Sequence, residues 1–296
     1  MLSVIDLVAQ KVLPPIDLGA LAGPHGLDFA GGKLYFTAET SKVIGRYDPL
    51  TKRIDWVMGT GQDRTHMVWV NKTADKIVTS NVSSGTISII DQSAPQAGQG
   101  GPPPGRGPAP QGQPDQPSLG RQGGPPLGFG GNQPNWEVTD VPAGRGSEGF
   151  DVSPNGKEIW TANAQDSSAT IIDFAAKKAI QTIPVSVSGN RLKFTPDGKY
   201  VLISGSSSGA GGPGGPDAAP SGPNLVIIDA TTRKEVKQLN LGGGAAGILM
   251  DLNGSRAFVA SSGGNKVAVV DLKSLAVTGE IGPLGQPNGM AWAVRK

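Results

Sequence analysis

The stretch SEGFDVSPNGKEIWTANAQDSSATIIDFAAKKAIQTIPV (147–185) decides the fold. It holds four short runs rich in apolar residues, and the first two are joined by the turn sequence SPNGK (153–157). The third run ends at Asp173, and a polar turn leads from it into the fourth. Short runs of this kind, joined by Asn-Gly and other polar turns, are typical of antiparallel hairpins. The stretch therefore predicts a four-stranded meander, whose strands we name A to D in chain order.

The same pattern recurs along the whole chain. Six apolar segments end in Asp, as a C strand should: SVID (3–6), GRYD (45–48), SIID (88–91), TIID (170–173), VIID (226–229) and AVVD (268–271). Five complete units follow from this alignment: 25–65, 66–147, 148–189, 190–245 and 246–287. Apart from two inserts, each unit has about 40 residues, which is the size of one β-propeller blade. The repeat predicts an all-β propeller made of four-stranded antiparallel blades.

The two ends of the chain predict a sixth blade. Residues 2–6 and 11–18 have the pattern of strands C and D, and NGMAWAVRK (288–296) has the pattern of strand A. We expect the ring to close by pairing of these N-terminal and C-terminal strands, with six blades favoured and seven as the alternative. Strand B of the sixth blade is missing. Either that blade closes incompletely, or the chain is a shortened form of a longer precursor, which is the interpretation we favour at this stage.

Two inserts interrupt an otherwise single domain that spans residues 1–296. Of the 45 Gly and 25 Pro residues, 34 fall in the segments 92–135 and 205–223. Neither segment has an apolar period, so neither can bury enough surface to offset the entropy of ordering it. We expect both to be disordered, 92–135 as a C–D loop and 205–223 as a B–C loop.

Composition excludes several classes of function. The chain has no Cys, which excludes a disulfide scaffold and thiolate chemistry. Its 26 Lys and Arg nearly balance its 24 Asp and Glu, and no basic run is present, so nothing indicates nucleic acid or an anionic membrane. There is no apolar run long enough to span a membrane and no motif for a nucleotide, a flavin or haem. We expect a monomer, periplasmic or secreted if a signal peptide precedes this sequence and cytoplasmic if the chain is complete.

The repeat units resemble known propeller families. The segments 158–185 and AFVASSGGNKVAVVDLKSLAVTGEI (257–281) resemble the YVTN-type β-propeller repeat. The segment PHGLDFAGGKLYFTAETSKVIGRYDPLTKRI (24–54) is similar to repeats of gluconolactonase-like and streptogramin-lyase-like propellers. The matched residues are those that build a blade, so the resemblance is specific for the fold and weak for function.

Several repeated positions are expected to be structural. The C-strand Asp can accept backbone N–H bonds in the turn that follows it, and Asn155, Asp197 and Asn253 suit the A–B hairpins. One apolar column is expected to pack between neighbouring sheets: Phe29, Val70, Val152, Phe194, Met250 and Trp292. Gly stands at four of six positions near the start of strand A, which indicates a crowded backbone near the ring axis, and Arg191 breaks that pattern. Its guanidinium is expected either in the channel or directed outward.

The first residue of strand A is the candidate functional position. Across the six repeats it is occupied by His25, His66, Glu148, Asn190, Ala246 and Asn288, so both histidines of the chain share one column. Strand A lines the central channel of a propeller, so these side chains should form a ring at one mouth. The B strands end on the same face, and their last positions add a wider polar circle for ligand binding: Glu39, Asn81 and Asn163.

The ring suggests two kinds of metal site. His25, His66 and Glu148 suit a Zn-like ion, whereas Glu148, Asn190 and Asn288 offer oxygen ligands for Ca²⁺ or Mg²⁺. The resemblance to gluconolactonase-like propellers implies an ion that polarises a lactone carbonyl, and that to streptogramin lyases implies a general base beside Mg²⁺. In either enzyme interpretation the catalytic residues are His25, His66, Glu148 and Arg191. The alternative is that these polar groups only bind water at the channel mouth.

The leading functional prediction is a YVTN-type module that binds a small molecule or an extracellular protein through this face. The main alternative is a metal-dependent lactonase or lyase. A third is a structural role, in which 92–135 serves as a flexible tether.

Overall fold

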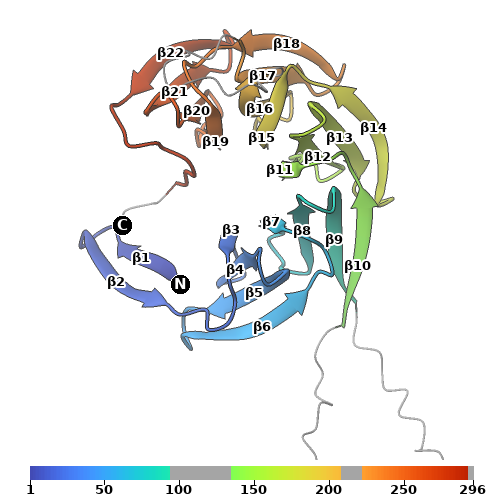
Figure 1. Ribbon diagram of the computed structural model, residues 1–296, viewed down its shortest axis with the longest axis vertical. Helices are drawn as coiled ribbons and strands as arrows, with labels where there is room; N and C mark the ends of the chain where they lie inside the picture. The colour runs from blue at the N-terminus through green and yellow to red at the C-terminus, as the bar shows by residue number, and fades with distance from the viewer. Residues whose placement is uncertain (94–134, 208–221, 293–296) are drawn as a thin grey trace, which may run out of the picture.

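This computed structural model describes residues 1–93, 135–207 and 222–292, which contain twenty-two β-strands and no helix. The strands form five four-stranded sheets and one two-stranded sheet, all antiparallel, arranged around a common centre (Figure 1). The all-β propeller class is therefore confirmed. Within the described residues no helix could cross a membrane.

Each of the five complete blades is an A-B-C-D meander in which every strand pairs with the next. Blade 1 contains β3 (Pro24–Ala30), β4 (Lys33–Ala38), β5 (Val43–Asp48) and β6 (Arg53–Gly59). Blade 2 contains β7 (Thr65–Val70), β8 (Lys76–Asn81), β9 (Thr86–Ser93) and β10 (Asn135–Pro142). Blade 3 contains β11 (Ser147–Val152), β12 (Glu158–Asn163), β13 (Ser168–Asp173) and β14 (Lys178–Pro184). Blade 4 contains β15 (Val187–Phe194), β16 (Tyr200–Ser207), β17 (Leu225–Asp229) and β18 (Lys234–Leu239). Blade 5 contains β19 (Ala245–Met250), β20 (Arg256–Ser261), β21 (Lys266–Asp271) and β22 (Ala276–Ile281).

The sixth blade is only partly present. β1 (Leu2–Asp6) and β2 (Lys11–Ile16) pair with each other and supply strands C and D. The segment 288–296, predicted as strand A, differs from that prediction where it is described. Residues 288–292 have no strand pairing, and 293–296 lie outside the described residues. With no strand B beside it, this segment has no backbone partner, and the predicted pairing that closes the ring is not formed among the described residues.

The A–B hairpin turns of blades 3, 4 and 5 are formed by the Asn-Gly and Asp-Gly pairs in their sequences. In the A–B hairpins of blades 3, 4 and 5, Asn155, Asp197 and Asn253 each accept a backbone N–H from two residues ahead, at 2.9–3.0 Å. The glycine after each of these residues has a φ between 68° and 72°, a conformation that residues with a Cβ rarely adopt. These three turn predictions are confirmed.

The C-strand Asp residues behave as expected in five repeats and differ in one. Asp6, Asp48, Asp173, Asp229 and Asp271 each accept a turn N–H at 2.7–2.9 Å. Asp91 instead pairs with Lys76 and, at 2.6 Å, with Lys177. The described residues that follow Asp91 remain in β9, which continues to Ser93, and do not form a turn there.

The inserts interrupt blades 2 and 4 at the expected connections. Residues 94–134 lie between β9 and β10, and residues 208–221 lie between β16 and β17. The predicted disorder of 92–135 and 205–223 falls almost entirely outside the described residues.

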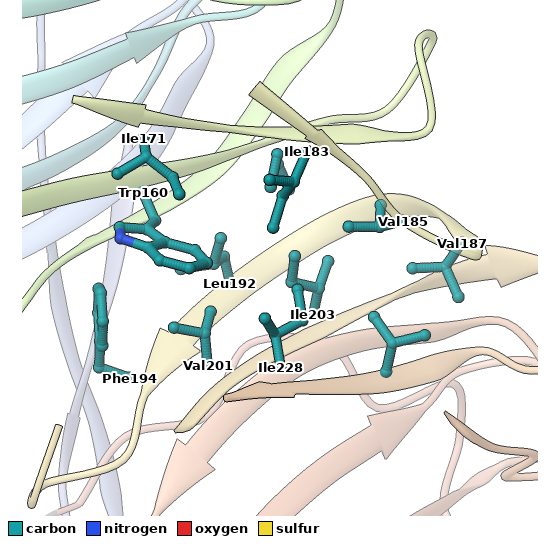
Figure 2. Close-up of a cluster of buried hydrophobic side chains, with 13 residues drawn as sticks. Trp160, Ile171, Ile183, Val185, Val187, Leu192, Phe194, Val201, Ile203 and Ile228 are labelled. Carbon is teal, nitrogen blue, oxygen red and sulfur yellow. The ribbon is translucent and has the colours of Figure 1, made fainter. Parts of the chain in front are cut away.

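The hydrophobic core lies between neighbouring blades. Between blades 3 and 4, Trp160 faces Phe194, with ring centroids 5.8 Å apart, and Leu192 and Ile203 complete a fully apolar cluster (Figure 2). The third residue of the B strand has the same role in blades 1, 2 and 4, since Tyr35, Val78 and Leu202 also belong to clusters shared with the following blade.

The predicted apolar column is buried in blades 2, 3 and 4, half-buried at Met250 in blade 5, and exposed at Phe29 and Trp292. Val70, Val152 and Phe194 are buried, but Phe29 is 61% exposed and Trp292 is 45% exposed. Phe29 faces the two-stranded sheet β1–β2, beside which no B strand is found among the described residues, and Trp292 lies in a segment without strand pairing. The prediction of core packing is wrong for these two aromatic residues.

The crowding predicted near the ring axis is confirmed. A Cβ added to Gly26 would lie 2.6 Å from the carbonyl oxygen of His66, and one added to Gly149 would lie 2.6 Å from Cα of Arg191. These glycines let the innermost strands of successive blades approach closely. The A strands therefore bring the candidate positions into one small region, although these are the second residues of β3, β7, β11 and β19 and the fourth residue of β15 rather than the first residues predicted.

Candidate metal centre

The two histidines lie side by side at one end of the central channel. His25 in β3 and His66 in β7 have ring centroids 3.8 Å apart, with an interplanar angle of 31°. His66 is buried and His25 is exposed. Their neighbouring strands are held together by Thr37, whose hydroxyl accepts the N–H of Gly26 at 2.8 Å and donates to the carbonyl of His66 at 2.6 Å. This is the arrangement that the shared repeat column predicts.

A carboxylate faces each nitrogen of the His66 ring. Nδ1 is in direct contact with Oε1 of Glu39, the residue after β4. Nε2 lies 3.0 Å from Oε2 of Glu148, the second residue of β11. Three successive blades therefore contribute to one cluster, with His66 at its centre.

Two arginines surround this cluster. Arg64 Nε lies 3.6 Å from Glu39 Oε1, and its Nη1 lies 3.5 Å from Glu148 Oε1. Arg191 in β15 places Nη1 3.6 Å from Glu148 Oε2 and 3.4 Å from His66 Nε2. Of the two orientations left open by the sequence, Arg191 therefore takes the inward one. It also lines a channel cavity of about 240 Å³ formed by the A strands of all five complete blades.

The environment changes the protonation of the cluster. Although His25 is exposed overall, part of its ring lies against His66 and is desolvated there; this desolvation, with the charge of His66 acting in the same direction, lowers the pKa of His25 to about 4, so His25 is neutral at pH 7. Burial alone would raise the pKa of Glu148. The hydrogen bond from His66 and the charges of His66, Arg64 and Arg191 outweigh that effect and hold the pKa below its usual range. The site thus combines a neutral imidazole with an ionised carboxylate.

His25, Glu39 and His66 have the geometry of a metal-ligand set. One potential ligand atom from each lies within 4.8 Å of the other two. Nε2 of His66 faces Glu148, so Nδ1 is the His66 nitrogen that could bind an ion together with the carboxylate of Glu39. A carboxylate that binds the remote nitrogen of a ligating His orients the ring and raises its basicity. Glu148 therefore has the position of an orienting group rather than that of the ligand predicted from the sequence.

Asn190 and Asn288 are predicted as further ligands, but the contacts that place them near the channel are made by their backbone carbonyls. The carbonyl of Asn190 accepts a hydrogen bond from Arg191 at 3.0 Å, and the carbonyl of Asn288 lies against Gly247. Among the described residues neither amide side chain forms a hydrogen bond to the His and Glu cluster.

Asn81 and Asn163, predicted to bind ligand, are fully buried within their blades. The amide nitrogen of Asn81 donates to Ser88 at 2.8 Å, and that of Asn163 donates to Thr170 at 2.9 Å. Both side chains secure the B–C connection of a blade. Of the predicted wider circle, only Glu39 reaches the cluster, as a contact of His66.

Sequence reasoning missed Arg64, although a signal for it exists. Arg64 stands two residues before His66, where the corresponding residues of other repeats are Gly23 and Gly146. Its φ is 56°, close to the 71° and 73° of those glycines. A left-handed φ carries a conformational cost for a residue with a Cβ, but Lys42, Lys52, Lys177 and Arg233 share it, so the signal lies in the replacement of Gly within the repeat.

Comparisons with known proteins support the fold only. No protein-family model matches the sequence, and no curated protein matches it. Among solved structures, hydrazine synthase of Kuenenia stuttgartiensis is similar, with a TM-score of 0.54 and 12% sequence identity over 92% of this chain and 90% of that one. At this identity the likeness concerns architecture alone, and the chain is an all-β protein with a propeller-like arrangement of sheets.

Proposed function

We propose that this propeller binds a divalent transition ion at His25, Glu39 and His66 and uses the ion to bind a small ligand at the channel mouth. The observation that carries the proposal is the convergence of two imidazoles and a carboxylate within 4.8 Å. Mixed nitrogen and oxygen donors suit Zn²⁺ better than Ca²⁺ or Mg²⁺, which prefer oxygen. Three protein ligands also leave a coordination position open for water or a ligand.

The surrounding charges define the class of ligand. Arg64 is about half exposed, and Arg191 lies between the cluster and the channel cavity. Both guanidinium groups can donate to carbonyl or carboxylate oxygens. A small molecule that carries such an oxygen, with its apolar part toward the channel, fits this environment.

The test is calorimetric titration of the full chain with ZnCl₂. We expect one ion per chain, and we expect His25→Ala and Glu39→Gln each to abolish or greatly weaken binding. Glu148→Gln should weaken binding about 10- to 100-fold, as expected for an orienting carboxylate. Glu280→Gln removes an exposed carboxylate in β22 and is the matched control. Equal binding in the parent and the His25→Ala variant would refute the site.

A metal-dependent lactonase is the second candidate, and the open coordination position favours it. A lactone carbonyl oxygen bound there would be polarised, water would add to the carbonyl carbon, and the ring ester bond would break to give a hydroxy acid. Turnover of a lactone panel by the Zn²⁺-loaded chain, lost in His66→Ala, would support this activity. Zn²⁺ binding without turnover would leave the binding function and exclude hydrolysis of those lactones.

A further inference from the structure

The channel cavity lies inward of the metal centre. It is enclosed by the innermost strands β3, β7, β11, β15 and β19, which surround the common centre of the ring (Figure 1). Its lining residues stand one to three positions after the repeat column that contains His25 and His66, and Arg191 joins the cavity to that column. Cavities that hold drug-sized ligands measure about 300–1,000 Å³. This cavity, at about 240 Å³, therefore suits a smaller molecule.

A second repeat column lines the inner end of this cavity. Three positions after the His column, blades 1, 2 and 3 have Asp28, Trp69 and Asp151, and blade 4 has Lys193. Arg191 stands two positions before Lys193 in the same strand, and two residues of a strand span about 7 Å. A guanidinium group therefore marks one end of the cavity, and two carboxylates mark the other.

Backbone N–H groups hold both carboxylates in place. Oδ2 of Asp28 accepts the N–H of Val70 at 2.7 Å, and Oδ1 accepts that of Phe29 at 2.8 Å. Oδ2 of Asp151 accepts the N–H of Phe194 at 3.0 Å. The bonds to Val70 and Phe194 each reach the A strand of the following blade, so the packing of the ring fixes the positions of the carboxylates.

The charge of Asp28 has no ion-pair partner in the described part of the chain. Asp151 pairs with Lys193 at 3.2 Å, whereas the hydrogen bonds of Asp28 come from backbone N–H groups alone. Burial raises the pKa of Asp28 and outweighs the two backbone hydrogen bonds, which act in the opposite direction. A cation that enters the cavity would stabilise the ionised form of this carboxylate.

We propose that the ligand of this channel is a short ω-amino carboxylate, with its carboxylate at Arg191 and the metal ion and its ammonium group at Asp28. Trp69 lines the same end of the cavity, and an aromatic ring beside a carboxylate suits an organic ammonium group. The methylene groups would lie along an apolar wall that includes Met67, Phe150 and Ile248. The carboxylate end rests on the proposed function, whereas the ammonium end rests on Asp28 and the cavity.

The test is calorimetric titration of the full chain with ε-aminocaproate and with caproate, which lacks the ammonium group. We expect ε-aminocaproate to bind at least about tenfold more tightly, as expected for one hydrogen bond between charged groups. This preference should be present both in the Zn²⁺-loaded chain and in the metal-free chain, because Asp28 does not contact the metal centre. Zn²⁺ should strengthen the binding of both probes alike, because it acts on the carboxylate that they share.

Two variants with opposite expected effects test the ammonium end. Asp28→Asn should abolish the preference for ε-aminocaproate, and its amide oxygen can still accept the N–H of Val70. Lys193→Gln should raise the affinity for ε-aminocaproate several-fold, because it removes a competing cation from Asp151; a variant that only disturbs the fold would not have this effect. Glu280→Gln, which removes an exposed carboxylate in β22, is the matched control and should change neither affinity.

The outcomes separate this proposal from the metal centre. Equal binding of the two probes, binding of neither probe in either form of the chain, or a preference that is unchanged in Asp28→Asn would overturn the proposal. Failure of the metal centre alone would remove the effect of Zn²⁺ on both probes and leave the preference for ε-aminocaproate.

Discussion

Truncating the side chain of the third residue of strand B should lower the free energy of unfolding by an amount that depends on how completely the following blade covers that side chain. Trp160 in blade 3 is fully buried against Phe194, whereas Phe258 in blade 5 is half-buried against the exposed Trp292. Truncation of a buried Trp removes its transfer free energy and leaves a cavity, so Trp160→Ala should lower the free energy of unfolding by about 3–5 kcal/mol. Phe258→Ala should lower it by less than about 2 kcal/mol, because part of that ring is already in contact with water.

Urea denaturation followed by Trp fluorescence and by circular dichroism measures both values, and the two probes test whether unfolding is cooperative. Glu158, which accepts the indole N–H of Trp160 at 2.7 Å, keeps a second partner in Arg233 at 2.9 Å, so its carboxylate is not left unpaired in Trp160→Ala. Equal losses in the two variants would refute the conclusion that the sixth blade leaves its neighbours incompletely covered.

Three further predictions concern backbone fit and charge. Gly149→Ala should lower the free energy of unfolding by about 1–3 kcal/mol, because its Cβ would meet the backbone of β15. Gly59→Ala, whose Cβ would lie in open space, should leave the free energy of unfolding almost unchanged. Equal effects of the two variants in urea denaturation would contradict the close approach. Arg64→Gly should leave the free energy of unfolding unchanged or raise it by up to about 1 kcal/mol. The reason is that Gly adopts the left-handed conformation without the cost of a Cβ, and the ion pairs lost involve a half-exposed guanidinium. A lower thermal midpoint in Arg64→Gly would show that those ion pairs dominate. The hydrogen bond from Lys33 lowers the pKa of Asp48 to about 2, so the stabilisation from this carboxylate is complete above its unfolded pKa of about 3.8 and is lost as the pH falls toward 2. The fall in the free energy of unfolding at acid pH should therefore be shallower in Asp48→Asn. An unchanged acid dependence would exclude this contribution.

The blade architecture could be predicted from sequence because it depends on local patterns. Alternating apolar residues, Asn-Gly turns such as Asn155-Gly156, and the Asp at the end of each C strand all act within a few residues of one another. Such local signals determine strands and hairpins directly. The close approach of neighbouring A strands could also be predicted, because Gly recurs at four of the six equivalent positions.

The composition of the metal centre could be predicted only in part. The repeat register brought His25, His66 and Glu148 into one column, and all three meet in the structure. It could not show that Glu39 rather than Glu148 faces Nδ1 of His66, because that depends on side-chain direction across blades. Nor could it distinguish Asn81, whose amide is used inside the blade, from a ligand-binding residue.

The incomplete burial of Phe29 could not be predicted from its own repeat. Its column is apolar in all six units, and the residues that bury its equivalents belong to the preceding blade. Beside β1–β2, where the described part of the chain supplies no strand B, the same residue type is exposed. Packing between repeats therefore depends on which neighbours are present as well as on the repeat pattern itself.

X-ray absorption spectroscopy of the Zn²⁺-loaded chain tests the central claim most directly. The chain has two histidines and no cysteine, so any imidazole ligation must come from His25 and His66. We predict a first shell of nitrogen and oxygen at about 2.0–2.1 Å, with imidazole scattering from two rings that falls to one ring, or disappears with the metal, in His25→Ala. A shell of oxygen ligands alone, or an imidazole signal that is unchanged in His25→Ala, would contradict the proposed metal centre.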